Sequence, residues 1–191
     1  MTVQFFEVPS VKLNKKDVFR YLRCGNEPPA QVCEQVECCI DDAQTKPDFR
    51  AVYAVVPVSI RDDTVLLGGL PVKSEKLAEN LSGTKKAVLF CASCGVWFDR
   101  KIAASRLSPS QAIIWDALGT AAIEQLCDDF CDHMNTVRPR FSPGYGDLAL
   151  AFQSDLLNLL QADRNLGIGL TDSLLMTPTK SVTAIAALEL L

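Results

Sequence analysis

The sequence predicts an α+β protein with an antiparallel or mixed sheet and one long central helix. Residues 49–60 and 87–92 are rich in β-branched and aromatic side chains, as is typical of buried strands. Residues 109–135 have apolar side chains at helical spacing, which predicts a helix of about 40 Å. Strands and helices do not alternate strictly along the chain, so a parallel sheet with crossover helices is not expected.

The first part of the chain is expected to contain short helices. Residues 1–13 alternate weakly and predict an edge strand or an arm. Asn14 is the predicted N-cap of a short helix, with Asp17 at its third position and its end at Gly25. A second helix is expected up to Pro47, because apolar residues recur at helical spacing at Val32, Val36, Cys39, Ile40 and Ala43.

The middle of the chain is expected to add most of the sheet. Turn residues separate the apolar segments, and the period of the pattern changes to that of strands. The expected elements are strands at 49–60 and 64–67 around a turn at 61–63, a helix at 74–81 that ends at Gly83, and a strand at 87–92 that continues through 96–98.

Ser108 marks the clearest boundary in the sequence. It is the predicted N-cap of the long helix, Pro109 is its first residue, and Gln111 completes a capping box. Small residues such as Gly119 and Ala121 leave a thin face where another backbone can approach. The predicted core stripe of this helix consists of Trp115, Leu118, Ala122, Leu126 and Phe130. The later elements are predicted as a helix at 148–160 and strands at 168–170 and 182–190.

The length of 191 residues predicts one domain, 1–191, with an N-terminal arm and helices in 1–48 and the sheet, long helix and a ligand loop in 49–191. The net charge of −4 argues against nucleic acid as a partner. No apolar run is long enough to span a membrane, and the first residues lack the features of a signal peptide. A cytoplasmic chain with reduced cysteines is therefore expected.

The segment Arg-Phe-Ser-Pro-Gly-Tyr-Gly-Asp, which begins at Arg140, is the strongest candidate for a binding site. Arg140 can grip a carboxylate or a phosphate with two hydrogen bonds, and Tyr145 offers a flat face and a hydroxyl. Pro143 fixes φ, whereas Gly144 and Gly146 can adopt positive φ. Two interpretations stay open here. The loop holds a small molecule with an anionic end and a flat or cationic end, or it is a Pro-Gly turn with an aromatic plug.

Carboxylates gather on the long helix. Asp116 and Glu124 lie two turns apart and share roughly one face, and Asp128, Asp129 and Asp132 extend the acidic character. This pattern is typical of a solvated helix face. The alternative is that one carboxylate faces the ammonium group of a ligand.

The cysteines include one motif, Cys91-Ala-Ser-Cys94, that could hold zinc or carry redox chemistry. No second motif of this kind accompanies it, and His133 is the only histidine. Buried, unreactive thiols are therefore favoured. His133 is predicted to lie on the surface, and no catalytic residue or metal ligand is assigned.

The segment from Arg140 to Asp147 resembles the R-x-S-P-G-Y-G-D segment of the activation (S-adenosylmethionine-binding) domain of cobalamin-dependent methionine synthase. The likeness is strongest to short, stand-alone versions of that domain. It is specific from about residue 112 to 188 and looser from Asp17 onward. Further matching segments are 116–124, 156–160, 168–171 and 178–186.

This resemblance implies a C-shaped domain around a twisted sheet that binds S-adenosylmethionine. It implies that Arg140 pairs with the methionine carboxylate, that Tyr145 contacts the sulfonium or the adenosine, and that Glu124 meets the ammonium group. Gly144, Gly146 and Pro143 would hold the loop. The implied chemistry is reductive methylation: inactive cob(II)alamin on a partner is reduced, and the resulting cob(I)alamin takes the methyl group from the sulfonium. The chain would therefore belong to a methyltransferase system for methionine biosynthesis and would not act alone.

The implied partner is a cobalamin-binding methionine synthase module or another corrinoid protein, with a flavodoxin- or ferredoxin-type reductant. The surroundings of His133 do not match the cobalt-binding Asp-x-His-x-x-Gly loop of corrinoid domains, so cobalamin is expected only on the partner. The family's Asp-Trp-Thr-Pro segment and a final aromatic segment have no counterpart here. The alternative hypothesis is a non-catalytic interaction module of corrinoid metabolism that keeps the fold but does not bind S-adenosylmethionine.

Overall fold

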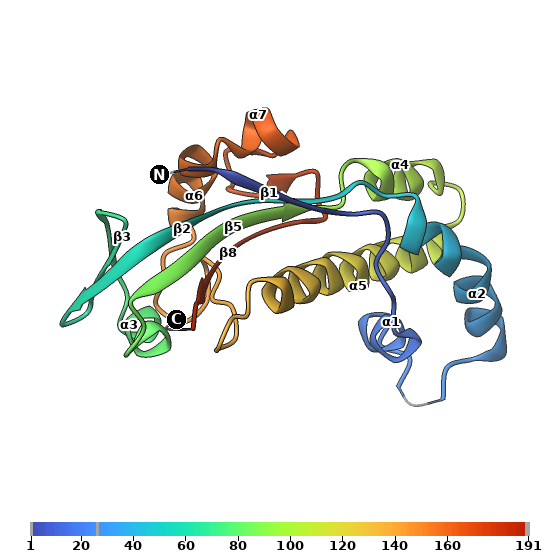
Figure 1. The fold of residues 1–191 in the computed structure, drawn as a ribbon. Coiled ribbons are helices and arrows are strands. Elements are labelled where there is room, and N and C mark those ends of the chain that lie inside the picture. Colours follow the sequence, from blue (N-terminus) through green and yellow to red (C-terminus); the bar gives the residue numbers. More distant parts are fainter. Residues whose placement is uncertain (1, 26, 190–191) are drawn as a thin grey trace.

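The computed structural model describes residues 2–25 and 27–189 and contains a twisted six-stranded antiparallel sheet (Figure 1). The strand order is β4-β3-β2-β5-β8, and β1 also pairs with β2. The strands are β1 (Gln4–Val8), β2 (Phe49–Arg61), β3 (Thr64–Leu67), β4 (Leu70–Lys73), β5 (Lys86–Ser93) and β8 (Ser181–Ala187). Two further strands, β6 (Gly169–Leu170) and β7 (Met176–Thr177), form a separate small ribbon.

β2 organises the sheet because both of its edges are used. One edge pairs with β5, whereas β1 and β3 share the other edge at opposite ends of the strand. β8 pairs with β5 along its whole length, from Ser181 to Ala187, and it is the last strand in the order. Its outer edge is therefore available to other parts of the chain.

Helices cover both faces of the sheet (Figure 1). One face packs against α1 (Lys15–Tyr21), α2 (Ala30–Thr45), α4 (Trp97–Ala104) and the long α5 (Pro109–His133). The other face packs against α3 (Glu75–Leu81), α6 (Phe152–Leu160) and α7 (Ala162–Leu166). No helix in the described ranges is long and apolar enough to cross a membrane.

Alternate strand residues supply two separate cores, because successive side chains of a strand point to opposite faces. In β5, Phe90 packs on the α5 side, where its ring centroid lies 4.7 Å from that of Phe130. Its neighbour Leu89 lies in the other core with Leu156 and Leu160 of α6. One sheet thus holds α5 on one face and α6 on the other at fixed positions.

The α+β class, the long central helix and most elements match the sequence predictions. Asn14 caps α1 through its side chain, which accepts a hydrogen bond from the amide of Lys16 at 3.0 Å. Ser74 caps α3 in the same way. The sheet is antiparallel throughout its paired strands, so of the two predicted alternatives the mixed one does not occur there.

Two predictions of local structure were wrong. Residues 96–98 do not extend a strand, because Gly95 turns the chain at φ +62 and α4 begins at Trp97, whose ring packs 5.4 Å from Trp115. The capping box is absent, since the Ser108 side chain accepts no cap hydrogen bond and Gln111 donates to the Cys39 sulfur at 3.2 Å.

The bounds of several predicted elements also differ from those in the structure. The helix predicted at 148–160 begins only at Phe152, after a series of turns. The last strand was predicted at 182–190, but β8 covers Ser181–Ala187 and residue 190 lies outside the described residues. Three short elements were not predicted: β4, β7 and α7.

Candidate functional site

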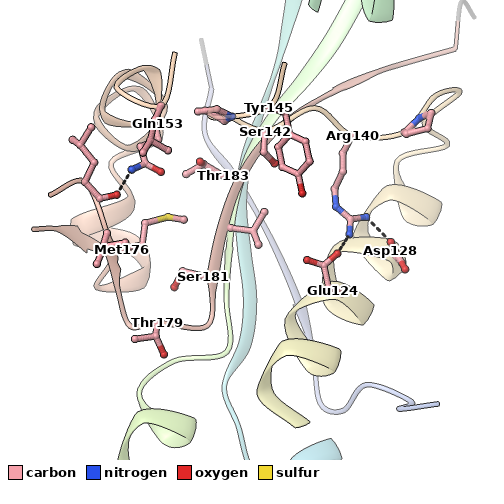
Figure 2. Close-up of a pocket in the computed structure, with 16 residues that line it drawn as sticks. Glu124, Asp128, Arg140, Ser142, Tyr145, Gln153, Met176, Thr179, Ser181 and Thr183 are labelled. Atoms are coloured by element: carbon pink, nitrogen blue, oxygen red, sulfur yellow. Dashed lines mark hydrogen bonds and ion pairs between the residues drawn. The ribbon is translucent and has the colours of Figure 1, made fainter. Parts of the chain in front are cut away.

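A cleft of about 800 Å³ lies beside the first half of β8, at Ser181 and Thr183 (Figure 2). The C-terminal half of α5 forms one wall. The start of α6 and the turn at 174–176 form the opposite wall. The segment 139–145 closes one end, and Ser181 and Thr183 of β8 lie between the two walls.

The segment that follows α5 joins the outer edge of β8 and then leaves it. Phe141 donates its amide to the Ile185 carbonyl at 2.8 Å and accepts from the Ile185 amide at 2.9 Å. The next residues turn, with the Ser142 carbonyl accepting from the Tyr145 amide at 3.1 Å. Pro143 has no amide and cannot continue the ladder. The pairing therefore ends beside the cleft and leaves it open.

Two glycines shape this loop without lining the cleft. Gly144 has φ +92 and Gly146 has φ +55, which other residues rarely adopt. A Cβ at Gly146 would also lie 3.1 Å from Cγ of Lys76, so the loop packs closely on α3. Asp147 then fixes the end of the loop by accepting a hydrogen bond from the Ser74 hydroxyl.

Arg140 forms ion pairs with two carboxylates of α5 (Figure 2). Its Nη2 donates to Oε2 of Glu124 and its Nη1 donates to Oδ1 of Asp128. Burial by itself would lower the pKa of the guanidinium, but the hydrogen bond to Asp128 and the charges around it raise that pKa above its ordinary value. The arginine stays charged, and the three groups together carry one net negative charge.

Tyr145 lies at the end of the cleft that the loop closes. Its side chain is 68% exposed, and Figure 2 shows the ring between Ser142 and Arg140 with the hydroxyl directed into the cleft. An exposed aromatic ring held by a turn is a suitable surface for stacking or for contact with a cation. The cleft thus combines a charged wall with an aromatic end.

The structure brings together four of the six residues predicted to bind a cofactor: Glu124, Arg140, Pro143 and Tyr145. Their roles toward a ligand stay predictions. Sequence reasoning placed Asp128 only in a general acidic face, although its spacing of four residues from Glu124 put both on one side of the helix. It gave no site role to the opposite wall, which contains Gln153, Leu174, Leu175 and Met176.

Asp116, considered together with Glu124 in the sequence, belongs to a different contact. Its Oδ1 atom accepts from Nζ of Lys180 at 2.8 Å, and the same Nζ donates to Oγ1 of Thr120 at 3.0 Å. The Lys180 side chain is only 9% exposed and crosses α5 at Gly119, where a Cβ would lie 2.8 Å from Cε of the lysine. This contact anchors the start of β8 to the long helix.

The Cys91-Ala-Ser-Cys94 motif does not form a shared site. Cys91 lies in the core on the α6 side of the sheet and Cys94 in the core on the α5 side. Burial raises the pKa of both thiols well above the ordinary value, so neither is a ready thiolate. In the described ranges, no three His, Cys, Asp or Glu side chains are arranged to hold a metal. His133 is exposed, as predicted.

The comparisons with known proteins concern the fold. No family model and no curated protein matches the sequence. Among solved structures, the chain is similar to the crystal structure of the MetH reactivation domain bound to AdoHcy, with a TM-score of 0.77 and 14% sequence identity. The match covers 98% of this chain and 78% of that one. This chain therefore has an activation-domain-like fold, as the sequence predicted.

Proposed function

We propose that the chain binds S-adenosylmethionine in the cleft beside β8 and presents its methyl group to a cobalamin-binding partner in the cytoplasm. The observation that carries the proposal is the charged wall of Arg140, Glu124 and Asp128 at a cleft of about 800 Å³. The cleft lies in a chain whose fold is similar to that of the MetH reactivation domain bound to AdoHcy. The volume is within the range of about 300–1,000 Å³ that is typical of small-molecule sites.

The charged wall suits the amino-acid end of this ligand. Arg140 has five N–H donors, of which two are directed to Glu124 and Asp128, so donors remain for a carboxylate. The two carboxylates give the wall its net negative charge, which favours the ammonium group and the sulfonium. S-adenosylmethionine carries a net charge of about +1 at neutral pH, because its sulfonium is a permanent cation while the charges of its ammonium and carboxylate groups cancel.

The residues of the cleft hold and orient the ligand, and none of them needs to act as a nucleophile. The cobalamin of the partner would supply the group that accepts the methyl, after reduction by a flavodoxin- or ferredoxin-type protein. The contribution of this chain is then a fixed position of the sulfonium at an open cleft, together with a wall of complementary charge. The partner is proposed to be a cobalamin-binding methionine synthase module or a related corrinoid protein.

A second candidate function is an interaction module that keeps the fold without binding the ligand. The observation that favours it is the same ion-pair group, because Arg140 already has two carboxylate partners within the chain. Because these charged side chains already pair with one another, they do not require a ligand as a partner. The two candidates differ in whether S-adenosylmethionine binds at all.

Titration calorimetry with S-adenosylmethionine and S-adenosylhomocysteine tests the proposal directly. Saturable binding of one ligand per chain is expected, and the absence of heat at millimolar ligand, together with an unchanged melting temperature, would favour the interaction module. A second experiment adds the chain to a cobalamin-dependent methionine synthase that lacks its own activation domain. Recovery of turnover after cob(II)alamin accumulates is expected only with the chain, a reductant and S-adenosylmethionine together.

A further inference from the structure

The wall opposite Arg140 contains one buried polar side chain, that of Gln153 in the first turn of α6. The residue is 3% exposed, and it lines the cleft. Its Nε2 atom donates a hydrogen bond to the main-chain carbonyl of Leu174. The proposed function assigns no task to this residue, although a buried amide normally has partners for both its nitrogen and its oxygen.

The orientation of this amide follows from the chemistry of its partner. The Leu174 carbonyl can only accept, so the amide nitrogen must face it and Oε1 must lie on the other side. Figure 2 shows the oxygen of Gln153 directed toward the middle of the cleft. In the described part of the chain no donor is hydrogen-bonded to this oxygen, which leaves an acceptor that a ligand can use.

An unusual backbone angle and local hydrogen bonds define the turn that holds the Leu174 carbonyl. Leu174 has φ +62, a conformation that a branched apolar side chain rarely adopts. The turn is closed by a hydrogen bond from the Leu174 amide to the Thr171 carbonyl at 2.9 Å and by one from the Leu175 amide to the Thr171 hydroxyl at 3.1 Å. If the side-chain amide of Gln153 were rotated by 180°, its oxygen would face the Leu174 carbonyl, which is also an acceptor, and the hydrogen bond would be lost.

The floor of the cleft adds a second polar edge beside this acceptor. Ile185 exchanges both of its backbone hydrogen bonds with Phe141 on the outer edge of β8. Hydrogen-bonding direction alternates along an antiparallel strand, so the amide and carbonyl of Thr183, two residues away, point to the same outer edge. Thr183 lines the cleft, and no described strand pairs with it there. Met176 adds an apolar side chain to the cleft lining. The part of the cleft formed by Gln153, Thr183 and Met176 therefore suits a flat base with polar edges.

We propose that Gln153 is a specificity-determining residue that accepts a hydrogen bond from the exocyclic amine of the ligand's base. The cleft would then select a 6-aminopurine nucleoside over the 6-oxopurine analogue, which would place its own oxygen against Oε1. This inference rests on the proposed function, because it concerns the base of the ligand whose amino-acid end meets Arg140. An unpaired acceptor facing another acceptor is expected to weaken binding roughly 10- to 100-fold.

The test compares S-adenosylhomocysteine with S-inosylhomocysteine, whose base has an oxygen in place of the 6-amino group and a proton on the neighbouring N1. Wild-type protein is expected to bind the adenosyl compound roughly 10- to 100-fold more tightly. Gln153→Met keeps the approximate length of the side chain without the amide, and the ratio of the two affinities is expected to fall close to one. The matched control is Gln125→Met: Gln125 lies on α5 outside the cleft and donates to Asp129 at 2.8 Å. Its ratio should equal that of the wild type.

The ratio of the two affinities shows whether Gln153 recognises the base or has only a structural role. If Gln153 only supports the turn at Leu174, its replacement lowers both affinities equally and leaves the ratio unchanged, which would overturn the inference. A wild-type ratio near one overturns it as well, without any variant. If wild-type protein binds neither compound, the proposed function itself fails, so the two failures are distinguishable.

Discussion

Asp147 and Glu75 join the loop after α5 to the first turn of α3, across 72 residues of sequence. Oδ2 of Asp147 accepts a hydrogen bond from the Glu75 amide at 2.7 Å. Its Oδ1 accepts from the Ser74 hydroxyl and from the Lys76 amide, the latter at 3.3 Å. A carboxylate at this position satisfies amides that a helix leaves free at its start. The end of the loop that presents Tyr145 to the cleft is thus fixed by a helix from another part of the chain.

The hydrogen bonds of Asp147 should make the stability of the folded chain depend on pH in the acidic range. The hydrogen bond from Ser74 and those from the backbone amides lower the pKa of the Asp147 carboxyl. A lowered pKa in the folded state means that the stabilisation is present above the ordinary carboxyl pKa, about 4, and is lost as pH falls through the lowered value. We expect Asp147→Asn to lower the melting temperature at pH 7 and to flatten its decrease between about pH 5 and 3. Asp132→Asn, at an exposed carboxylate, serves as the control, and parallel curves for wild type and Asp147→Asn would contradict this account.

Replacing Arg140 should separate binding from scaffolding. Arg140→Ala removes the donor of a charge-assisted bond, which is expected to cost about 2–3 kcal/mol, or roughly 30- to 150-fold in affinity for S-adenosylmethionine. Arg140→Lys should restore only part of it, because an ammonium lacks the planar fork. The melting temperature should change little, since ion pairs with partly exposed carboxylates contribute about 0.2–1 kcal/mol. The paired measurement is ligand titration and ligand-free melting; a large loss of stability with unchanged affinity would make Arg140 a scaffold residue.

Glu124→Gln tests the charge of the wall. The change makes the remaining pair of Arg140 and Asp128 neutral, so the wall loses its attraction for a cationic ligand. We expect the affinity for S-adenosylmethionine to fall roughly 3- to 10-fold and that for S-adenosylhomocysteine, a zwitterion without net charge, to fall less, with a larger difference at low salt. Asp129→Asn, on the same helix but outside the cleft, is the control. Equal losses for both ligands at all salt concentrations would contradict a role for net charge.

Gly119→Ala should destabilise the junction of α5 with the start of β8. The added Cβ would lie 2.8 Å from Cε of Lys180 and 2.9 Å from Cγ of Phe98. Overpacking of this kind costs about 1–3 kcal/mol, which corresponds to a decrease of several degrees in the melting temperature. Gly169→Ala is the matched control, because its Cβ would meet only Oγ1 of Thr177 at an ordinary 3.5 Å. Similar melting temperatures for the two variants would show that α5 and Lys180 can move apart freely.

The sequence predicted those elements whose signals are local. The cap at Asn14 acts within one turn of helix, and its prediction was correct. The helix at Trp97 was missed because its large aromatic residues are also typical of strands, and packing against Trp115 decides between the two. The capping box at Ser108 failed for a similar reason, since Gln111 finds a partner in α2 instead.

The candidate site could be predicted on one wall only. Arg140 and Tyr145 stand in a short segment with unusual residues, and this segment also resembles a known family. Gln153 has no such local signal, because its importance depends on the carbonyl of Leu174 and on the cleft between α6 and β8. A glutamine in an amphipathic helix does not reveal from sequence that it is buried.

The position of β8 has a consequence for the order in which the molecule can assemble. Ser181 of β8 contacts Ser93 of β5, 88 residues earlier, with their hydroxyls 3.0 Å apart. Contacts between such distant parts of a chain form slowly compared with local turns and helices. On the ribosome, the edge of β5 emerges long before its partner and can pair with other chains in the meantime. A nascent chain without β8 has no cleft floor, so a ligand can stabilise only molecules in which this late strand is already in place.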